Sequence, residues 1–172
     1  MRFWQKIFGI SLFVLFGFVG SCTLGFAQGD GNETPMPMPS NPLKLTLKLD
    51  KQTYSPDEPI VVQFRVTNVS KTSQRLAFAT TQHYDFEIHA GDVKGPVIWR
   101  WSKGRLFGQV VLQQTLAPGQ EILYKETIYP QDAKHPEGIP PLKPGKYTLL
   151  AILTTMPRTA RPSVSCTFEV KK

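Results

Sequence analysis

Strict alternation of apolar and polar residues is the feature that most limits the folds open to this chain. Leucine occupies every second position from Leu43 to Leu49, with lysine or threonine between. The same period of two recurs over residues 60–66, directly after the Pro-rich turn signal at 55–59. Successive side chains of a β-strand point to opposite faces, so this period predicts strands with one buried face.

Short strands of this kind, separated by turn signals such as Pro118-Gly119 and Pro144-Gly145, continue along the chain. No helix of useful length is expected. Many short strands divided by turns are typical of an antiparallel sandwich or barrel. We predict an all-β, antiparallel immunoglobulin-like β-sandwich of about seven to nine strands, with Tyr147 placed for a tyrosine-corner hydrogen bond. The expected strands are 43–49, 60–66, 74–79, 84–90, 97–101, 108–114, 121–129, 146–154 and 163–170.

The N-terminal segment has the pattern of an export signal. Arg2 and Lys6 precede an uncharged apolar run over residues 7–19, which is the arrangement of a secretory signal peptide. Small residues around Ala27 then offer a cleavage site. The pattern predicts a signal peptide of residues 1–27.

Two alternatives to simple cleavage stay open. Residues 19–22 resemble a bacterial lipobox, in which Cys22 would be acylated and would anchor the protein to a membrane. An uncleaved anchor is the other, because no charge interrupts residues 7–27 and a membrane span needs ~20 apolar residues. We expect an exported bacterial protein that is secreted, periplasmic or attached to the cell envelope.

The rest of the chain divides into a tether and one domain. Residues 28–41 are rich in Gly, Pro, Asn and Met without an apolar period, which predicts a flexible tether. Residues 42–172, about 130 in number, suit a single domain with its own core. The only cysteine in this domain, Cys166, alternates with Phe168 and Val170, so we expect a buried, inert thiol and no disulfide.

Charge and composition exclude some classes of partner. The net charge is +7, but the lysines and arginines are scattered along the chain. Nucleic-acid binders concentrate such charge on one helix or stripe, so no nucleic acid is expected. The positive charge of the domain favours attraction to an acidic cell wall or lipid surface. We also expect a monomer.

Residues able to carry catalysis are sparse. The one suggestive array is His83, Asp85, Glu87 and His89, which share a face of an expected strand. At ~3.3 Å per residue its two histidines lie ~20 Å apart and cannot share a metal, and neighbouring members could supply two ligands at most. We therefore interpret the array as a solvated strand face. No phosphate-binding loop, Cys-x-x-Cys pair or nucleophile elbow is present. The chain is expected to be no enzyme and to bind no metal or cofactor.

Four motifs in order resemble the BsuPI family, which is named for an intracellular proteinase inhibitor of Bacillus. They are Tyr84 to Ile88, the Trp-Arg-Trp-Ser stretch within residues 97–102, Gly104 with Phe107, and the turn at 116–120. The resemblance implies a compact β-sandwich connected with inhibition of serine proteinases. The motifs of the family do not identify its contact residues, so the resemblance assigns no binding residue.

Two functions follow as hypotheses. The first is an exported proteinase inhibitor or protease-regulating module. The second is a cell-envelope protein- or carbohydrate-interaction module, for which Trp99 and Trp101 would have to form an exposed platform for a sugar. A Trp on a sandwich strand more commonly fills the space between the sheets, so we expect both to be core residues.

Three loops are expected to present contacts to a partner. They are residues 102–105, which are basic; residues 135–142, which are stiffened by proline; and residues 156–162, which carry arginine between prolines. Binding loops on a rigid scaffold commonly act in this way. A proteinase of trypsin-like specificity could accept a basic side chain from the first or third loop. The predicted partner-binding residues are Lys103, Arg105, Pro140, Pro141 and Arg158.

Overall fold

The computed structural model describes residues 41–172. The predicted signal peptide, Cys22 and the predicted tether as far as residue 40 lie outside the described residues. Within residues 41–172, no helix has the length and apolar character needed to cross a membrane. The strands are β1 (Leu43–Leu49), β2 (Thr53–Tyr54), β3 (Ile60–Asn68), β4 (Gln74–Phe78), β5 (Tyr84–Ala90), β6 (Val97–Arg100), β7 (Leu112–Leu116), β8 (Glu121–Ile128), β9 (Gly145–Leu153) and β10 (Ser163–Val170), and the 3₁₀ helix η1 (Arg158–Ala160) precedes the last of them.

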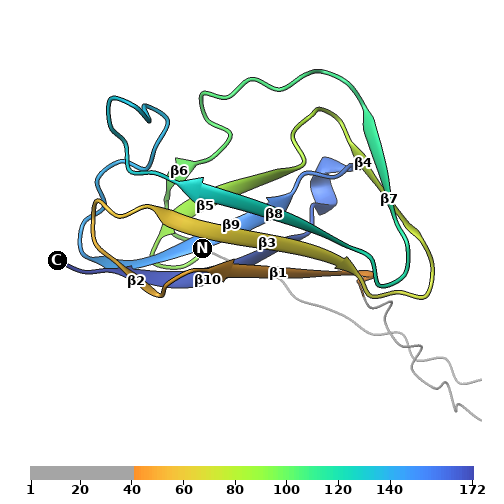
Figure 1. The fold of residues 1–172 in the computed structure, drawn as a ribbon, viewed down its shortest axis with the longest axis horizontal. Coiled ribbons are helices and arrows are strands. Elements are labelled where there is room, and N and C mark those ends of the chain that lie inside the picture. The colour runs from red at the N-terminus through yellow and green to blue at the C-terminus, as the bar shows by residue number, and fades with distance from the viewer. Residues whose placement is uncertain (1–40) are drawn as a thin grey trace, which may run out of the picture. The chain divides into compact units, whose positions relative to one another are not determined.

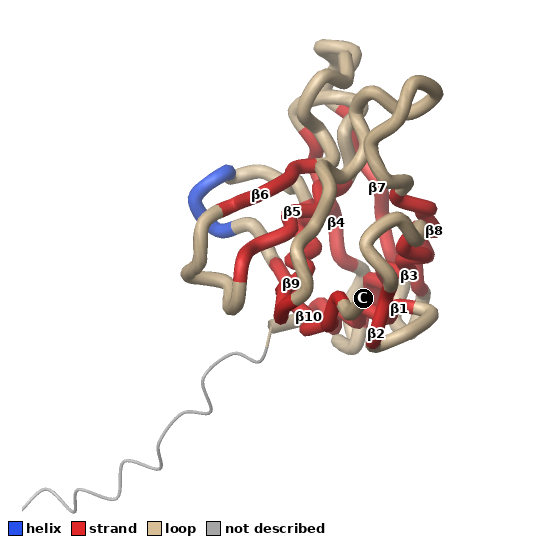
Figure 2. The backbone as a smooth tube through the Cα atoms, turned by 90° about the vertical axis from the view of Figure 1, so that its left-hand side faces the viewer, coloured by secondary structure: helices blue, strands red, loops and turns tan. Residues whose placement is uncertain are grey.

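Two main sheets face each other: in Figure 1 the sheet with β3 lies in front of the sheet with β9, and Figure 2 shows the two layers side by side after a quarter turn. One has the strand order β1-β3-β8, the other β2-β10-β9-β5-β6, and β4 pairs with β7 in a small third sheet. All pairings are antiparallel except that of β2 with β10. The two main sheets correspond to the A-B-E and G-F-C groups of an immunoglobulin sandwich. The predicted all-β sandwich is confirmed, and the two-residue β2 is a strand that the alternation did not reveal.

The core lies between the two main sheets and comes from the alternating residues. Val62, Phe64 and Val66 of β3 are fully buried, as are Phe86 and Ile88 of β5. The rings of Phe64 and Phe86 meet edge to face with centroids 6.2 Å apart, which joins one sheet to the other. Each such side chain contributes ~1.5–3 kcal/mol of stability through burial of apolar surface.

The tyrosine corner is present at the start of β9. Tyr147 Oη donates a hydrogen bond to the carbonyl oxygen of Lys143, four residues upstream, at 2.7 Å. The Tyr147 ring also stacks on Phe168 of β10 with centroids 5.6 Å apart. The predicted corner is therefore confirmed, and it fixes the turn that leads into β9.

One expected strand is displaced along the sequence. We predicted a strand over 108–114, but β7 begins at Leu112, and Val110 and Val111 are exposed. The partner strand β4 has only five residues, and Phe78 at its end pairs with Leu112. Residues before Leu112 therefore have no strand to pair with, although their apolar character suggested one.

Cys166 lies on the inward-facing side of β10, but it is half-buried rather than fully buried. It packs against the core beside Val164. Burial raises the pKa of the Cys166 thiol to about 11. At neutral pH the thiol is thus protonated, which agrees with the predicted inert cysteine.

Candidate functional site

The structure brings two of the three predicted binding loops together at one end of the sandwich. They form the walls of a groove of about 460 Å³ whose floor is the edge strand β6. One wall is the turn after β6 and the other is the loop between β8 and β9. The groove is lined by Ile98, Trp99, Lys103, Gly104, Gln131, Pro136, Glu137, Gly138 and Pro140.

The first wall is a pair of overlapping tight turns. The amide of Lys103 donates to the carbonyl of Arg100, and the amide of Arg105 donates to the carbonyl of Ser102, both at 3.2 Å. Gly104 sits in the left-handed region with φ of 80°, where a residue without Cβ is unstrained. The turn is thus defined by its own backbone bonds.

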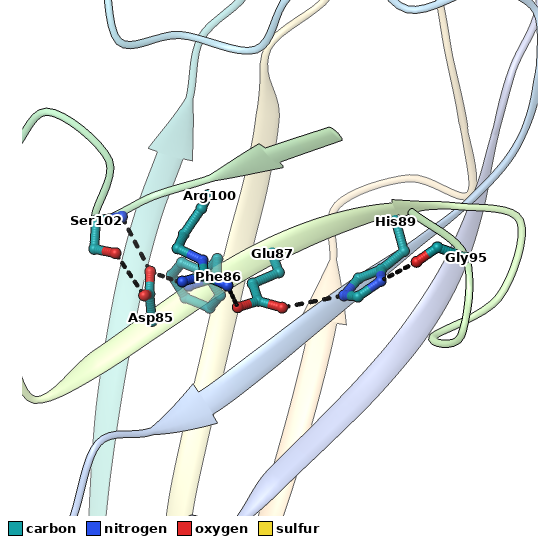
Figure 3. A network of polar contacts seen from close by, with 7 residues as sticks. All are labelled: Asp85, Phe86, Glu87, His89, Gly95, Arg100 and Ser102. Atoms are coloured by element: carbon teal, nitrogen blue, oxygen red, sulfur yellow. Dashed lines mark hydrogen bonds and ion pairs between the residues drawn. The ribbon is translucent and has the colours of Figure 1, made fainter. Parts of the chain in front are cut away.

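A buried carboxylate secures this turn to the sheet (Figure 3). Asp85 Oδ1 accepts hydrogen bonds from the amides of Ser102 and Phe86, each at 3.0 Å. Asp85 Oδ2 accepts a third from Ser102 Oγ at 2.6 Å. Hydrogen bonds to a charged acceptor are the stronger kind, contributing ~1.5–3 kcal/mol. β5 therefore holds the turn from beneath.

The same face of β5 continues as a row of buried polar side chains. Glu87 Oε1 lies 2.6 Å from Arg100 Nη2, and Glu87 Oε2 lies 3.2 Å from His89 Nε2. His89 Nδ1 in turn lies 3.0 Å from the carbonyl oxygen of Gly95. Figure 3 shows these contacts running along the strand.

The predicted solvated face over these residues is wrong. Asp85, Glu87 and His89 are each less than a tenth exposed. Each is covered by a partner from β6 or from the turns that flank β6. These partners provide the hydrogen bonds that the alternating sequence pattern led us to expect from water. His83 lies before β5 and instead stacks on Phe78, with ring centroids 4.5 Å apart. Among residues 41–172, no group of three or more His, Cys, Asp or Glu side chains could hold a metal ion.

The second wall, residues 131–142, is also firmly held. Trp99 Nε1 on β6 donates to the carbonyl oxygen of Glu137 at 2.8 Å, which ties the loop to the groove floor. Ile139 and Leu142 are buried in the core and anchor the far end of the loop. Both walls are therefore fixed to the same edge of the sandwich.

Asp132 closes the tip of this loop. Its Oδ1 accepts hydrogen bonds from the amides of His135 at 2.6 Å and Lys134 at 2.8 Å. The backbone hydrogen bond from His135 is the largest cause that holds the pKa of the Asp132 carboxyl below its usual range. The His135 ring stacks flat on Tyr129 with centroids 4.1 Å apart. The loop tip is therefore ordered by contacts within the loop.

Gly138 packs closely against the backbone at the end of β8. A Cβ placed there would lie 2.6 Å from the carbonyl oxygen of Tyr129 and 2.7 Å from that of Pro130. Real Cβ atoms do not come so near backbone oxygen, so only glycine lets the loop fold back over the end of β8.

The predicted basic contacts have different environments. Lys103 lines the groove and is exposed. Arg105 instead lies over the indole of Trp101, with Cζ 4.3 Å from the ring centroid, and its Nε donates to the Trp101 carbonyl at 3.0 Å. Arg100, on β6, pairs with Glu87 instead.

The remaining predicted contacts do not all reach the groove. Pro140 lines it, whereas Pro141 is exposed and does not. Arg158 lies in η1, in a loop held to the end of β4 by a 2.8 Å bond from the Met156 amide to the Ala77 carbonyl. The third loop thus belongs to a different part of the surface.

Neither tryptophan forms an open platform for a sugar. Trp99 is 6% exposed and belongs to the core, as predicted. Trp101 is half-buried between Tyr84 and Phe107, with ring centroids 4.9 and 5.9 Å away.

The contacts that build the site were not evident from the sequence. Asp85 and Ser102 are 17 residues apart, and Trp99 and Glu137 are 38 apart. Alternation indicates which face a side chain takes, but no local pattern indicates which distant backbone atom it meets. The prolines of residues 135–142 were the local signal that pointed to the second wall.

The chain resembles known proteins in sequence, through a family model, and in fold, through solved structures. The model of the BsuPI family, described as intracellular proteinase inhibitor, matches residues 47–158. A search of curated protein sequences finds no match. Among solved structures, Spo0M, a sporulation control protein from Bacillus subtilis, has 17% identity and a TM-score of 0.51 over 77% of this chain. This chain spans 51% of that protein, and the likeness concerns the fold alone.

Two enzymes share weaker similarity. The β-glucosidase EmGH1 from Erythrobacter marinus has 10% identity and a TM-score of 0.41 over 75% of this chain and 15% of its own. The alkylpurine DNA glycosylase AlkC from Pseudomonas fluorescens has 15% identity and a TM-score of 0.44 over 76% of this chain and 31% of its own.

Proposed function

The chain belongs to the BsuPI family, a family described as intracellular proteinase inhibitors, and from this premise we propose that the domain binds and inhibits a proteinase through the groove end of its sandwich. The observation that carries the proposal is that both walls of the groove are fixed in place. Asp85 secures the turn at 102–105, and Trp99 secures the loop at 131–142.

Fixed walls favour tight binding for an energetic reason. A flexible loop loses roughly 1–2 kcal/mol of conformational freedom for each backbone residue that is ordered on docking. The residues of these walls are already ordered by hydrogen bonds and by the buried anchors Ile139 and Leu142. Docking of a proteinase would therefore cost little further ordering of these two loops, which favours affinity.

The proposed location is outside the cytoplasm. Its support is the charged start, apolar run and small residues around Ala27 in the N-terminal segment. An inhibitor exported in this way would meet proteinases of the cell envelope or of the surroundings.

Inhibition of a panel of secreted serine proteinases by the purified protein tests the proposal. Lys103→Ala removes the exposed cation of one wall, and Gly138→Ala displaces the backbone of the other. We expect each to weaken inhibition by about tenfold, or ~1.4 kcal/mol. Arg158→Ala is the matched control, because that arginine lies outside the groove and should leave inhibition unchanged.

Melting temperatures of the variants separate lost binding from lost folding. No inhibition at micromolar concentration across the panel would overturn the proposal and leave a surface interaction module as the description of the domain. Groove variants that inhibit as well as the Arg158→Ala control and the parent protein would place the contact elsewhere on the sandwich.

A further inference from the structure

The segment that follows the first wall exposes an apolar side chain completely. Leu106 is 100% exposed, and no other exposed large apolar residue of the described chain exceeds 59%. It lies between the turn at 102–105 and the start of β7, in residues that form no helix or strand. The fold itself makes no use of this side chain.

Both neighbours of Leu106 are held against one tryptophan. Arg105 stacks over the Trp101 ring and donates to its carbonyl, and the Phe107 ring lies 5.9 Å from that of Trp101. Both flanking side chains thus lie against Trp101, whereas the Leu106 side chain is fully exposed. The position of Leu106 is thus fixed by its neighbours.

The backbone just beyond is pinned as well. The amide of Gly108 donates to Thr81 Oγ1 at 2.9 Å, and the amide of Thr81 donates to the carbonyl of Gly108 at 3.0 Å. A Cβ at Gly108 would come within 3.1 Å of Thr81 Cγ2, so the two segments are in close contact. Leu106 therefore projects from a segment anchored on both sides.

A single exposed leucine is ordinary on a protein surface. This segment is unusual because three of the nine exposed large apolar residues of the described chain fall within residues 106–111. Val110 and Val111 are 49% and 59% exposed. Exposed apolar side chains that lie together on a surface are a feature of protein interaction sites, and here three of them belong to one short segment.

We propose that Leu106 is the specificity contact of the inhibitor and enters a proteinase pocket that takes a large apolar side chain. This inference rests on the proposed function and assigns its partner class. The two basic residues of the preceding turn suit a trypsin-like pocket less well in this geometry. Arg105 has its guanidinium on Trp101, and Lys103 lines the groove beside β6.

Inhibition constants of the purified protein against one proteinase with a large apolar specificity pocket and against trypsin test this assignment. Leu106→Ala should weaken inhibition of the first enzyme by roughly 10- to 100-fold, as loss of apolar groups from a specificity pocket does. Leu106→Phe should retain inhibition, and Leu106→Arg should lose it while gaining inhibition of trypsin. None should change the melting temperature, because the side chain is fully exposed.

Val69→Ala is the matched control. Val69 is 56% exposed and follows β3, at the end of β8 opposite to the groove. β8 has eight residues and so spans about 25 Å. This variant should inhibit like the parent protein.

The outcomes separate this inference from the function on which it rests. If the parent protein inhibits but Leu106→Ala behaves like Val69→Ala, the role of Leu106 is overturned while the inhibitor function stands. Inhibition of trypsin alone by the parent protein would also overturn it. If the parent protein inhibits neither these two enzymes nor any other of the panel, the proposed function fails and the assignment fails with it.

Discussion

The two faces of β5 are both buried, but by different means. Phe86 and Ile88 face the opposite sheet and are enclosed by apolar side chains. Asp85, Glu87 and His89 face the other way and are enclosed by hydrogen-bonding partners from β6 and its turns. One strand thus joins the core to a polar network.

The two faces of β5 contribute differently: the apolar face mainly stabilises the domain, and the polar face mainly positions the turn at 102–105. Apolar burial is non-directional and stabilises any compact arrangement that excludes water. Hydrogen bonds to a fixed carboxylate require one geometry, so the polar face determines where Ser102 and the turn at 102–105 lie. We expect changes on the inner face to lower stability, and changes on the outer face to alter the groove wall more than the stability.

Phe86→Ala is the variant with the largest expected effect. Removal of this fully buried ring should lower the free energy of unfolding by ~3–5 kcal/mol, because a cavity remains in the core. Urea denaturation followed by tryptophan fluorescence measures the change. A loss below ~1 kcal/mol would show that the inner face is not the main source of stability.

Glu87→Ala should have an intermediate effect. It removes the partner of the buried His89, at a loss of ~1–3 kcal/mol. The Arg100 side chain is 49% exposed, so water replaces much of its lost ion pair. Glu87→Gln is the matched control, because it keeps the shape and one carbonyl acceptor. A loss as large as that of Phe86→Ala would remove the distinction between the faces.

Ser102→Ala should change the groove more than the stability. It deletes the hydroxyl bond to Asp85 Oδ2 but leaves the amide bond to Oδ1, so the expected loss of stability is ~0.5–1.5 kcal/mol. Amide hydrogen exchange of residues 101–105 should become faster, and inhibition should weaken. Ser165→Ala, on an exposed position of β10, is the control. Unchanged exchange in the Ser102 variant would show that Asp85 does not order the turn.

The smallest expected effect is a difference in the reactivity of the Cys166 thiol between the folded and the unfolded protein. Burial raises its pKa from 9.0 to about 11, so below pH 9 the thiolate fraction in the folded protein is about a hundredfold smaller than in the unfolded chain. Labelling with a thiol reagent at pH 8 should be slow in the native protein and fast in urea. Equal rates would show that the inner face does not extend to this position of β10.

Prediction from the sequence was most successful where one face of a strand meets one apolar layer. The expected strands 43–49, 84–90 and 163–170 coincide with β1, β5 and β10. The prediction failed at Val110 and Val111, which are apolar but lie beyond the end of the strand that β7 pairs with. A hydrophobic run indicates that a strand could form, and the length of its partner decides whether it does.

The site was predictable in its loops but not in its geometry. Basic and proline-rich composition pointed to Lys103 and Pro140, which both line the groove. The same composition also pointed to Arg158, which lies elsewhere, and did not point to Leu106. Exposure of a loop residue depends on where its neighbours pack, and Arg105 and Phe107 both lie against Trp101.

The alternating pattern was enough to predict an antiparallel all-β fold, and the motifs of the sequence indicated the family. Both depend on residues close together in sequence, because strand period and turn chemistry are local properties. The folded structure was needed to show that buried Asp85 bonds Ser102, that Trp99 holds Glu137, and that the groove lies between these two contacts. These contacts join segments far apart in the chain. Their partners follow from the packing of the sheets, which no local pattern encodes.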